Sequence, residues 1–367
     1  MSSKDSRYRF LFAGGGTGGH LYPAIAVADQ IKTMKPEAEI LFVGTKNKIE
    51  GTVVPKLGYK FKSIWIKGFA RKFNLENLLF PLKLFVSAVQ SLMININYKP
   101  KVAIGSGGYV SGPAIWGASV MGAKIILLEQ NSYPGVTTRM LERKAQEIHI
   151  SFEDSKKYLR NKNALILTGN PVRKNLGSMD KKSALEKFGL SDTKKTLLIL
   201  GGSLGASSLN KAVVDNLEKL VGAGIQIIWQ TGKIYFEKYK SLNDENIKVL
   251  DFIEDMNAAY SACDLLLARS GATTIAEVLV LGIPSILVPS PNVAENHQYH
   301  NAKSLEEKEA AILIEDKNLN TKLAEIIINT VNNDSVLKKL SESAIKLAKP
   351  LAAEAIAKSA IKFAETI

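Results

Sequence analysis

A dense run of glycines near the amino terminus is the first segment whose residue types could do chemistry. Five of the six residues 14–19 are glycine, and His20 follows them directly. We expect this loop to open a helix, where backbone N–H groups and the helix dipole favour an anion such as phosphate. A plain strand-to-helix turn, with glycine needed only for packing, is the alternative. The excess of glycine favours anion binding.

The same loop matches the spacing G-x-G-x-x-G through Gly14, Gly16 and Gly19. A dinucleotide site would also need an acidic residue at the end of the second strand, to bind a ribose hydroxyl. That strand is expected to end within FVGTKN, residues 42–47, which contain no acidic residue. The sequence therefore argues against a nicotinamide or flavin cofactor.

Two further glycine-containing segments lie in the second half of the chain. Residues 201–206 follow an apolar run and add the hydroxyl of Ser203, so they could contact a phosphate or form a simple turn. Residues 269–277 would open another helix with unpaired amides. Glu277 would repel phosphate, but it could accept hydrogen bonds from sugar hydroxyls. This combination suits a nucleoside diphosphate. The alternative is that Glu277 only interacts favourably with the dipole of its own helix.

Alternating strands and helices must position these loops. Short apolar runs predict buried parallel strands, and helical periodicity lies between them. The expected strands are 9–13, 40–43, 102–104, 125–128, 164–167, 196–200, 225–229, 248–250, 265–268 and 285–288, and the clearest helices are 22–34, 209–220, 272–281 and 322–331. The order strand, glycine loop, helix occurs twice. We therefore expect an α/β protein with two doubly wound domains.

The domain boundary is expected where this alternation pauses, near Gly169-Asn-Pro171. We place the first domain at residues 1–168 and the second at 169–349. The last helical stretch, within 350–367, could pack back on the first domain. Because ligands of open parallel sheets bind at the carboxyl ends of the strands, the active site is expected between the two domains.

The composition is that of a globular protein with an excess of basic residues. The chain has 367 residues and a net charge of +13, which favours anionic partners: nucleic acid, anionic lipid or a phosphorylated substrate. Cys263 is the only cysteine, so no intrachain disulfide can form, which fits a reducing cytosol. No apolar run approaches the ~20 residues of a spanning helix, and the first residues do not form a secretory signal.

Motifs along most of the chain together resemble the MurG family, the undecaprenyldiphospho-muramoylpentapeptide β-N-acetylglucosaminyltransferases. In order, they are GGGTGGHLYPA (14–24), GGYVSGP (107–113), EQN (129–131), GNPVR (169–173), GGSLGA (201–206), FIEDM (252–256), RSGATTIAE (269–277) and HQYHNA (297–302). The resemblance implies the GT-B fold, with two Rossmann-like domains facing across a deep cleft. It also implies an inverting transfer of N-acetylglucosamine from UDP-GlcNAc to the 4-hydroxyl of lipid-linked (undecaprenyl-diphosphate) N-acetylmuramoyl-pentapeptide.

The resemblance further implies that the second domain holds most of the donor. The backbone of Ile253 would pair with uracil, and the carboxylate of Glu277 would bind the ribose hydroxyls. His297 stands where some family members carry glutamine, so no role is assigned to it. Other residues that would contact donor UDP-GlcNAc are Thr17, Gly18, Gly19, Asn131, Arg173, Ser203, Ala272, Thr273, Thr274 and Gln298, of which Asn131 and Gln298 would bind the sugar hydroxyls.

The first glycine loop would receive the diphosphate of the acceptor. The implied ligands there are Gly15, Gly16, His20 and Tyr109. His20 is also the candidate general base for the attacking hydroxyl, because histidine titrates near neutral pH. A His20 that binds the acceptor phosphate or orients the loop is the competing interpretation.

We expect no metal or other cofactor. The charge that develops on departing UDP would be stabilised by helix amides and Arg173. The chain has no Asp-x-Asp motif, and Asp251, Asp255 and Asp264 are spaced as residues that cap or solvate structure.

A basic and apolar segment within residues 64–98 suits an anionic membrane surface. It interleaves the apolar Phe69, Phe73, Leu75, Leu78, Leu79 and Phe80 with the basic Lys67, Arg71, Lys72 and Lys83. A core helix with a solvated basic face is the alternative. We expect a peripheral protein on the cytoplasmic face of the plasma (inner) membrane, beside other cell-wall synthesis enzymes. Nucleic acid is not expected as a partner, because aromatic residues make up only 7% and no recognition motif occurs.

Other functions of the same architecture remain open. The leading alternative is a UDP-sugar-dependent diacylglycerol glycosyltransferase, whose nucleotide motifs would look similar. A UDP-sugar epimerase would need no lipid site, and a membrane scaffold would need no intact nucleotide motifs. The first glycine loop and residues 107–113 favour the muramyl acceptor.

Overall fold

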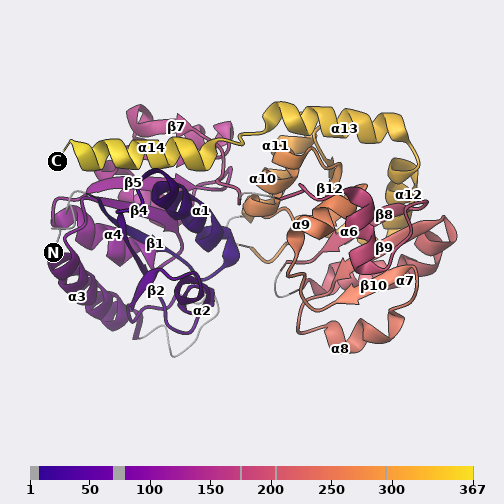
Figure 1. Ribbon diagram of the computed structural model, residues 1–367, viewed down its shortest axis with the longest axis horizontal. Coiled ribbons are helices and arrows are strands. Elements are labelled where there is room, and N and C mark those ends of the chain that lie inside the picture. Colours follow the sequence, from indigo (N-terminus) through magenta and orange to yellow (C-terminus); the bar gives the residue numbers. More distant parts are fainter. Residues whose placement is uncertain (1–7, 69–78, 174–175, 203–204, 294–295, 367) are drawn as a thin grey trace. The chain divides into compact units, whose positions relative to one another are not determined.

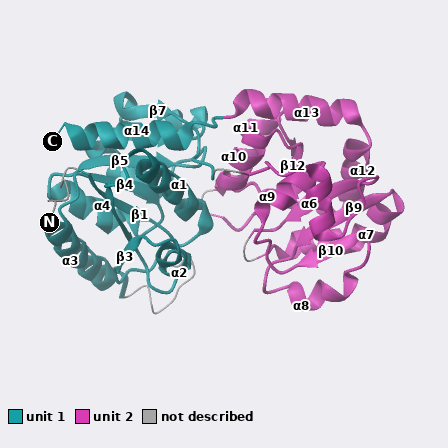
Figure 2. Cartoon of the chain, viewed as in Figure 1, with its two compact units in different colours: residues 1–173, 349–367 teal, residues 174–348 magenta. Residues whose placement is uncertain are grey.

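The computed structural model describes residues 8–68, 79–173, 176–202, 205–293 and 296–366. The chain divides into two compact units, shown in different colours in Figure 2. The first unit comprises Met1–Arg173 and Lys349–Ile367, and the second unit comprises Lys174–Ala348. Each unit has its own parallel sheet with helices on both faces, so the expected pair of doubly wound α/β domains is present. The division follows Arg173, a few residues beyond the expected boundary.

The first unit is built on a seven-stranded sheet with the order β3-β2-β1-β4-β5-β6-β7. Its strands are β1 (Arg9–Gly14), β2 (Glu39–Gly44), β3 (Lys60–Ser63), β4 (Val102–Gly107), β5 (Lys124–Glu129), β6 (Glu147–Ile150) and β7 (Leu165–Leu167). The sheet has a hydrophobic core on each face, and successive side chains of β1 point into them alternately. Phe10 and Phe12 belong to one core, and Leu11 and Ala13 belong to the other. Burial on both faces explains why the strand is a continuous apolar run.

Helices cover both faces of this sheet. The core that contains Phe10 is closed by α1 (Gly18–Met34), α2 (Ile49–Lys56) and α14 (Ala352–Glu365). The other core is closed by α3 (Phe80–Tyr98), α4 (Ser111–Val120) and α5 (Val136–Leu141). The carboxyl-terminal helix α14 thus belongs to the first unit, where it lies along α1 (Figure 1).

The second unit repeats the architecture with a six-stranded sheet of order β10-β9-β8-β11-β12-β13. Its strands are β8 (Lys195–Leu200), β9 (Ile225–Gln230), β10 (Ile247–Leu250), β11 (Leu265–Ala268), β12 (Ser285–Leu287) and β13 (Ile312–Leu313). Its helices are α6 (Lys181–Phe188), α7 (Ser207–Gly222), α8 (Phe236–Tyr239), α9 (Met256–Ala262), α10 (Ala272–Leu281), α11 (His297–Glu306), α12 (Leu319–Val331) and α13 (Asp334–Leu347). Trp229 fills the core, and its indole N–H donates to Asn210 Oδ1 at 3.1 Å.

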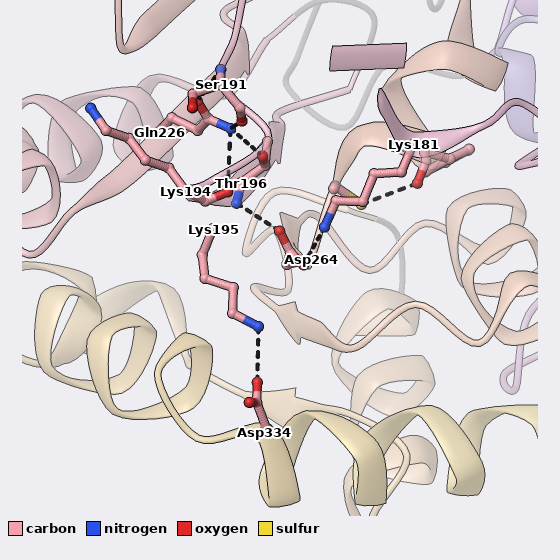
Figure 3. A network of polar contacts seen from close by, with 10 residues as sticks. Lys181, Ser191, Lys194, Lys195, Thr196, Gln226, Asp264 and Asp334 are labelled. Atoms are coloured by element: carbon pink, nitrogen blue, oxygen red, sulfur yellow. Dashed lines mark hydrogen bonds and ion pairs between the residues drawn. The ribbon is translucent and has the colours of Figure 1, made fainter. Parts of the chain in front are cut away.

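A polar network holds the amino-terminal end of the second sheet (Figure 3). Asp264, just before β11, accepts hydrogen bonds from the Thr196 backbone N–H at 2.8 Å and from Lys181 Nζ at 2.6 Å. Lys195 Nζ pairs with Asp334 at 2.8 Å, and Gln226 Nε2 donates to Thr196 Oγ1 at 2.8 Å. Because ligands bind at the opposite, carboxyl ends of such strands, we assign this network to stability.

Three strands were not anticipated. β3 reads KFKS and lies at the sheet edge with mostly exposed side chains, and β13 has only two residues. β6 reads EIHI, in which polar residues alternate with the two isoleucines. β3 and β6 lack the continuous apolar run that marks a buried strand, so pairing with a neighbouring strand decides their conformation. β13 lies within the short apolar run 310–314, which was not expected to form a strand.

Candidate active site

Both sheets have a point where the strand order reverses, and ligands of open α/β sheets bind there. In the first unit the reversal lies between β1 and β4, and in the second unit between β8 and β11. The loops that follow these four strands contain the first glycine loop, residues 107–109, residues 201–206 and residues 269–271. The fold therefore gathers the sequence motifs in pairs, one pair at the switch point of each sheet.

The first glycine loop opens α1 as expected. Thr17 precedes the helix in an extended conformation, and Gly18 and Gly19 lie in its first turn. Backbone N–H groups in a first turn have no partner within their helix, so they can donate to an anion. The N–H of Gly16, in contrast, donates to the Glu50 carboxylate at 2.9 Å.

Close packing explains part of the glycine content. A Cβ on Gly14 would lie 1.8 Å from Ser106 Oγ, and one on Gly107 would lie 2.7 Å from His20 Nδ1. Gly107 also has a φ of 96°, which other residues rarely adopt. The loops after β1 and β4 thus touch each other, and glycine allows His20 to sit between them.

The ring of His20 is held in one tautomer. Its Nδ1 lies 2.9 Å from the Ser106 carbonyl oxygen and 3.2 Å from Gln130 Oε1. The Gln130 amide is oriented because its Nε2 donates to the carbonyls of Ser106 and Leu128 at 3.0 and 3.3 Å. Since both neighbours of Nδ1 can only accept, Nδ1 carries the hydrogen. The other ring nitrogen, Nε2, then has the lone pair of the neutral imidazole.

Burial lowers the pKa of His20 below its ordinary value. Hydrogen bonds from Gln130 and the Ser106 backbone, and the negative charge of Glu50, act in the opposite direction but are smaller. The ring is therefore neutral near pH 7, and Nε2 can accept a proton. This is the state that a general base requires before reaction.

Tyr109 borders the same loop, with its ring 3.5 Å from where a Cβ on Gly16 would lie. Burial raises the pKa of the Tyr109 phenol, so the hydroxyl stays neutral and can donate a hydrogen bond. His20, Tyr109 and the glycine loop, which sequence motifs placed together, are neighbours in the structure.

Asn131 lies at the carboxyl end of β5, in the same unit as His20. Its backbone N–H donates to Glu129 Oε1 at 3.0 Å, and the Gly135 N–H donates to Glu129 Oε2 at 2.9 Å. Burial raises the pKa of Glu129, although these hydrogen bonds oppose that shift. Glu129 thus shapes the loop that presents Asn131. Arg173, also in the first unit, places its guanidinium 5.0 Å from the ring centroid of Tyr22.

In the second unit, α10 begins where the sequence predicted. Gly271 is extended, and Ala272, Thr273 and Thr274 form the first turn with their amides at the helix start. The hydroxyl of Thr273 is buried and has no hydrogen-bond partner within the described part of the chain. The amides of this turn are suited to a phosphate.

Glu277 lies one turn further along α10 and is buried. The Tyr260 hydroxyl, from α9, donates to its Oε2 at 2.7 Å. This contact orients the carboxylate, and the sequence did not single out Tyr260.

Arg269 is a second residue without an assigned role in the sequence. Its Nη1 pairs with Asp316 at 2.5 Å and its Nη2 donates to Ser208 Oγ at 2.7 Å. It also donates to the carbonyls of Val288 and Pro289. Arg269 joins the end of β11 to three other segments, so it supports the start of α10. Its position directly after a buried strand is the feature of the sequence that could have identified it as a residue of the site.

The remaining predicted donor residues belong to the second unit. The Ile253 N–H donates to Gln230 Oε1 at 2.8 Å, so uracil would have to displace Gln230 to use that donor. Gln298 is in the first turn of α11, beside His297, and its Oε1 accepts from the Ser290 N–H at 2.9 Å. Ser203 lies outside the described residues.

Asp251, Asp255 and Asp264 all have structural partners. Asp255 caps α9 by accepting from the Ala258 N–H, Asp251 accepts from the Phe252 N–H, and Asp264 belongs to the network of Figure 3. Among the described residues, no group of three His, Cys, Asp or Glu side chains is arranged to hold a metal ion.

Known proteins are similar to this chain over nearly its whole length. Residues 10–150 match the glycosyltransferase family 28 N-terminal domain, and residues 196–356 match the family 28 C-terminal domain. The crystal structure of Acinetobacter baumannii MurG aligns with a TM-score of 0.75 and 27% identity, covering 96% of this chain and 99% of that one. The UDP-N-acetylglucosamine–N-acetylmuramyl-(pentapeptide) pyrophosphoryl-undecaprenol N-acetylglucosamine transferase of Flavobacterium psychrophilum is 43% identical, covering 98% of this chain and 99% of the relative.

The chain belongs to the MurG family. The transferase of the same name from Bacteroides thetaiotaomicron is also 43% identical, over 98% of this chain and 99% of the relative. The family resemblance, the GT-B fold and the glycosyltransferase activity expected from the sequence are thereby confirmed. Within this MurG-family chain, His20, Tyr109, Asn131 and Arg173 belong to the first unit, whereas the residues from Ile253 to Gln298 belong to the second.

Proposed function

We propose that this chain transfers N-acetylglucosamine from UDP-GlcNAc to the 4-hydroxyl of undecaprenyl-diphosphate-linked N-acetylmuramoyl-pentapeptide. The product is the disaccharide lipid precursor of peptidoglycan. The 43% identity over nearly the whole length of a transferase with this named activity carries the proposal. It favours the muramyl acceptor over diacylglycerol, because the similarity includes the acceptor-side half of the chain as well as the nucleotide half.

In the reaction, His20 Nε2 takes the proton of the 4-hydroxyl while its oxygen attacks the anomeric carbon of N-acetylglucosamine. The bond from that carbon to the UDP oxygen breaks, and its electron pair leaves with UDP. His20 becomes an imidazolium whose Nδ1–H remains bound to Ser106 and Gln130. Gly15, Gly16 and the Tyr109 hydroxyl hold the acceptor diphosphate, while Thr17, Gly18 and Gly19 contact the donor.

The second unit binds the donor. Glu277 accepts hydrogen bonds from the ribose diol, Ile253 pairs with uracil, and Gln298 binds the sugar with Asn131. The amides of Ala272, Thr273 and Thr274 stabilise the charge that develops on departing UDP, together with Arg173 and Ser203. Fixed amide donors can perform this role without a metal ion.

The assay that tests this function uses the purified chain, UDP-GlcNAc and lipid-linked muramyl-pentapeptide, with a chelator present throughout. We expect labelled N-acetylglucosamine to reach the lipid at an undiminished rate, because helix amides stabilise the leaving group. Parallel reactions contain UDP-glucose as donor or diacylglycerol as acceptor, and we expect little transfer in either. Preferred transfer to diacylglycerol would contradict the proposed acceptor. Activity lost with chelator and restored by Mg²⁺ would contradict the metal-free mechanism.

We further propose that the chain acts on the cytoplasmic face of the inner membrane and binds its anionic surface through α3, beside other cell-wall enzymes. A narrow stripe of α3 is apolar and exposed: Leu82, Phe85, Met93 and Ile96 are 51%, 68%, 58% and 50% exposed. Trp116, on the adjoining helix α4, is also exposed. Such an apolar stripe on a helix suits the boundary between head groups and acyl chains. No described helix is long and apolar enough to span a bilayer.

One of the basic residues expected to face the membrane, Lys83, is buried. Lys83, expected on the charged surface, is only 8% exposed, and its ammonium lies 5.7 Å from the Trp65 ring centroid. Its stem packs within the fold, so it is not available to lipid head groups. Lys67 is exposed, while Arg71 and Lys72 lie outside the described residues.

Replacing Phe85 and Met93 by glutamate should release the chain from anionic vesicles. Burial of each side chain contributes up to roughly 1.5–3 kcal/mol, so we expect vesicle affinity to fall about tenfold or more. Vesicle sedimentation measures this, and activity on a soluble, short-chain acceptor should persist. A control with Ile234 and Ile345 changed to glutamate introduces the same charge at exposed apolar positions of the second unit. Equal vesicle binding by both double variants would show that α3 does not contact lipid.

A further inference from the structure

A buried carboxylate lies under the first glycine loop, and no sequence motif pointed to it. Glu50, in the first turn of α2, is only 1% exposed. Its Oε1 accepts from the Thr45 backbone N–H at 3.0 Å and from Thr45 Oγ1 at 2.6 Å. Its Oε2 accepts from the Gly16 N–H at 2.9 Å. A buried carboxylate is costly unless its oxygens are hydrogen-bonded, and these three donors meet that need.

The loop is shaped around this group. A Cβ on Gly15 would lie 2.4 Å from the Glu50 carboxyl carbon, and one on Gly44 would lie 2.4 Å from its Cγ. Glycine is therefore required at these positions because Glu50 occupies the space. The bond to Gly16 joins α2 to the loop 34 residues earlier in the chain.

We propose that Glu50 is a positioning residue of the transferase: it holds the glycine loop against His20, and its buried charge favours the imidazolium that forms as His20 takes the proton. The inference rests on the proposed function, in which His20 is the base. Glu50 itself takes no proton and touches neither substrate. Its negative charge partly offsets the desolvation of the protonated ring, and a charge acts more strongly in a buried site than in water.

The charge distribution around the loop supports this assignment. Glu50 is the group whose charge favours the protonated form of His20, against the larger effect of burial. Of the other ionisable groups on the adjoining segments, burial keeps the Tyr109 phenol neutral and raises the pKa of Glu129, and the charge of Lys67 acts on Tyr109.

The test compares full-length wild type with Glu50→Gln and Glu50→Asp. In Glu50→Gln the charge is removed, so the pKa of the His20 ring, followed by NMR titration of histidine-labelled protein, should fall below the wild-type value. The value of kcat should fall about ten- to a hundred-fold, because the loop loses its anchor. Glu50→Asp keeps the charge but retracts it by one methylene. It should reduce kcat while leaving the His20 pKa nearer to wild type.

Glu142→Gln is the matched control. Glu142 is another buried carboxylate of the first unit, and it accepts the Arg160 N–H at 2.7 Å. Its loss should lower stability without moving the His20 titration. A His20 titration and kcat in Glu50→Gln equal to those of Glu142→Gln would overturn the proposal. If Glu50→Gln does not fold, Glu50→Asp decides: a wild-type kcat overturns the positioning role. The NMR titration does not depend on catalysis. If His20→Ala shows that His20 is not the base, the effect of Glu50 on the pKa of His20 can still be measured, so the two hypotheses can fail separately.

Discussion

Replacing His20 with alanine should lower kcat by about 10²–10⁴-fold, the usual contribution of a positioned general base. The affinity for UDP should be unchanged, because Ile253 and Glu277, the proposed ligands of its uracil and ribose, lie in the other unit. The physical reason is the fixed tautomer: with Nδ1–H held by Ser106 and Gln130, Nε2 is the nitrogen that accepts the hydroxyl proton. Steady-state kinetics with the lipid acceptor, and a separate measurement of UDP binding, check both parts.

The pH dependence should change together with kcat. Burial lowers the pKa of His20, so the wild-type rate should fall only as the pH drops below the ordinary histidine value of about 6.5. Below that lowered pKa the ring is protonated and cannot act as a base. The acidic limb of the rate profile should therefore vanish in His20→Ala, whose residual activity has no imidazole to titrate.

The competing role of His20 predicts different kinetics. If His20 binds the acceptor phosphate, its loss raises the acceptor KM and leaves the acidic limb in place. His300→Ala is a suitable control, because His300 is an exposed histidine of α11. Changes of only a few-fold in both kcat and acceptor KM would contradict both roles and leave His20 as a structural residue.

Replacing Glu277 with alanine should weaken UDP binding roughly ten- to a hundred-fold. Hydrogen bonds from the ribose hydroxyls to a charged acceptor contribute about 1.5–3 kcal/mol, and a buried carboxylate loses little of this to solvent. Isothermal titration with UDP measures the effect, and the acceptor KM should hardly change.

Tyr260→Phe provides the matched control for Glu277. It removes the hydrogen bond of 2.7 Å within the protein but leaves the carboxylate for the ribose. We expect a smaller loss of UDP affinity than in Glu277→Ala, since only the orientation of the carboxylate is affected. Equal UDP affinity in wild type and Glu277→Ala would mean that Glu277 does not bind the ribose and only stabilises its helix, α10.

Much of the fold could be predicted because its signals are local. The central strands are continuous apolar runs, since both faces of each sheet are covered, and the runs ending at Ala13 and Ala268 lead directly into the loops of the site. The glycine loop and the start of α10 could be found for the same reason. Strands β3 and β6 could not, because their sequences mix polar and apolar residues. β13 was missed because a short apolar run such as 310–314 does not distinguish a strand from a helix segment.

The sequence by itself determined the family, the two-domain α/β fold and the motifs of the site, because these depend on residue type and short spacing. Only the tertiary structure decided that α14 joins the first unit, that Lys83 is buried, and which groups surround His20. Ser106 and Gln130 are 86 and 110 residues from His20 along the chain, and Glu50 meets the glycine loop across 34 residues. Such contacts depend on which strands lie side by side, and strand order arises from the packing of the whole sheet rather than from any local pattern.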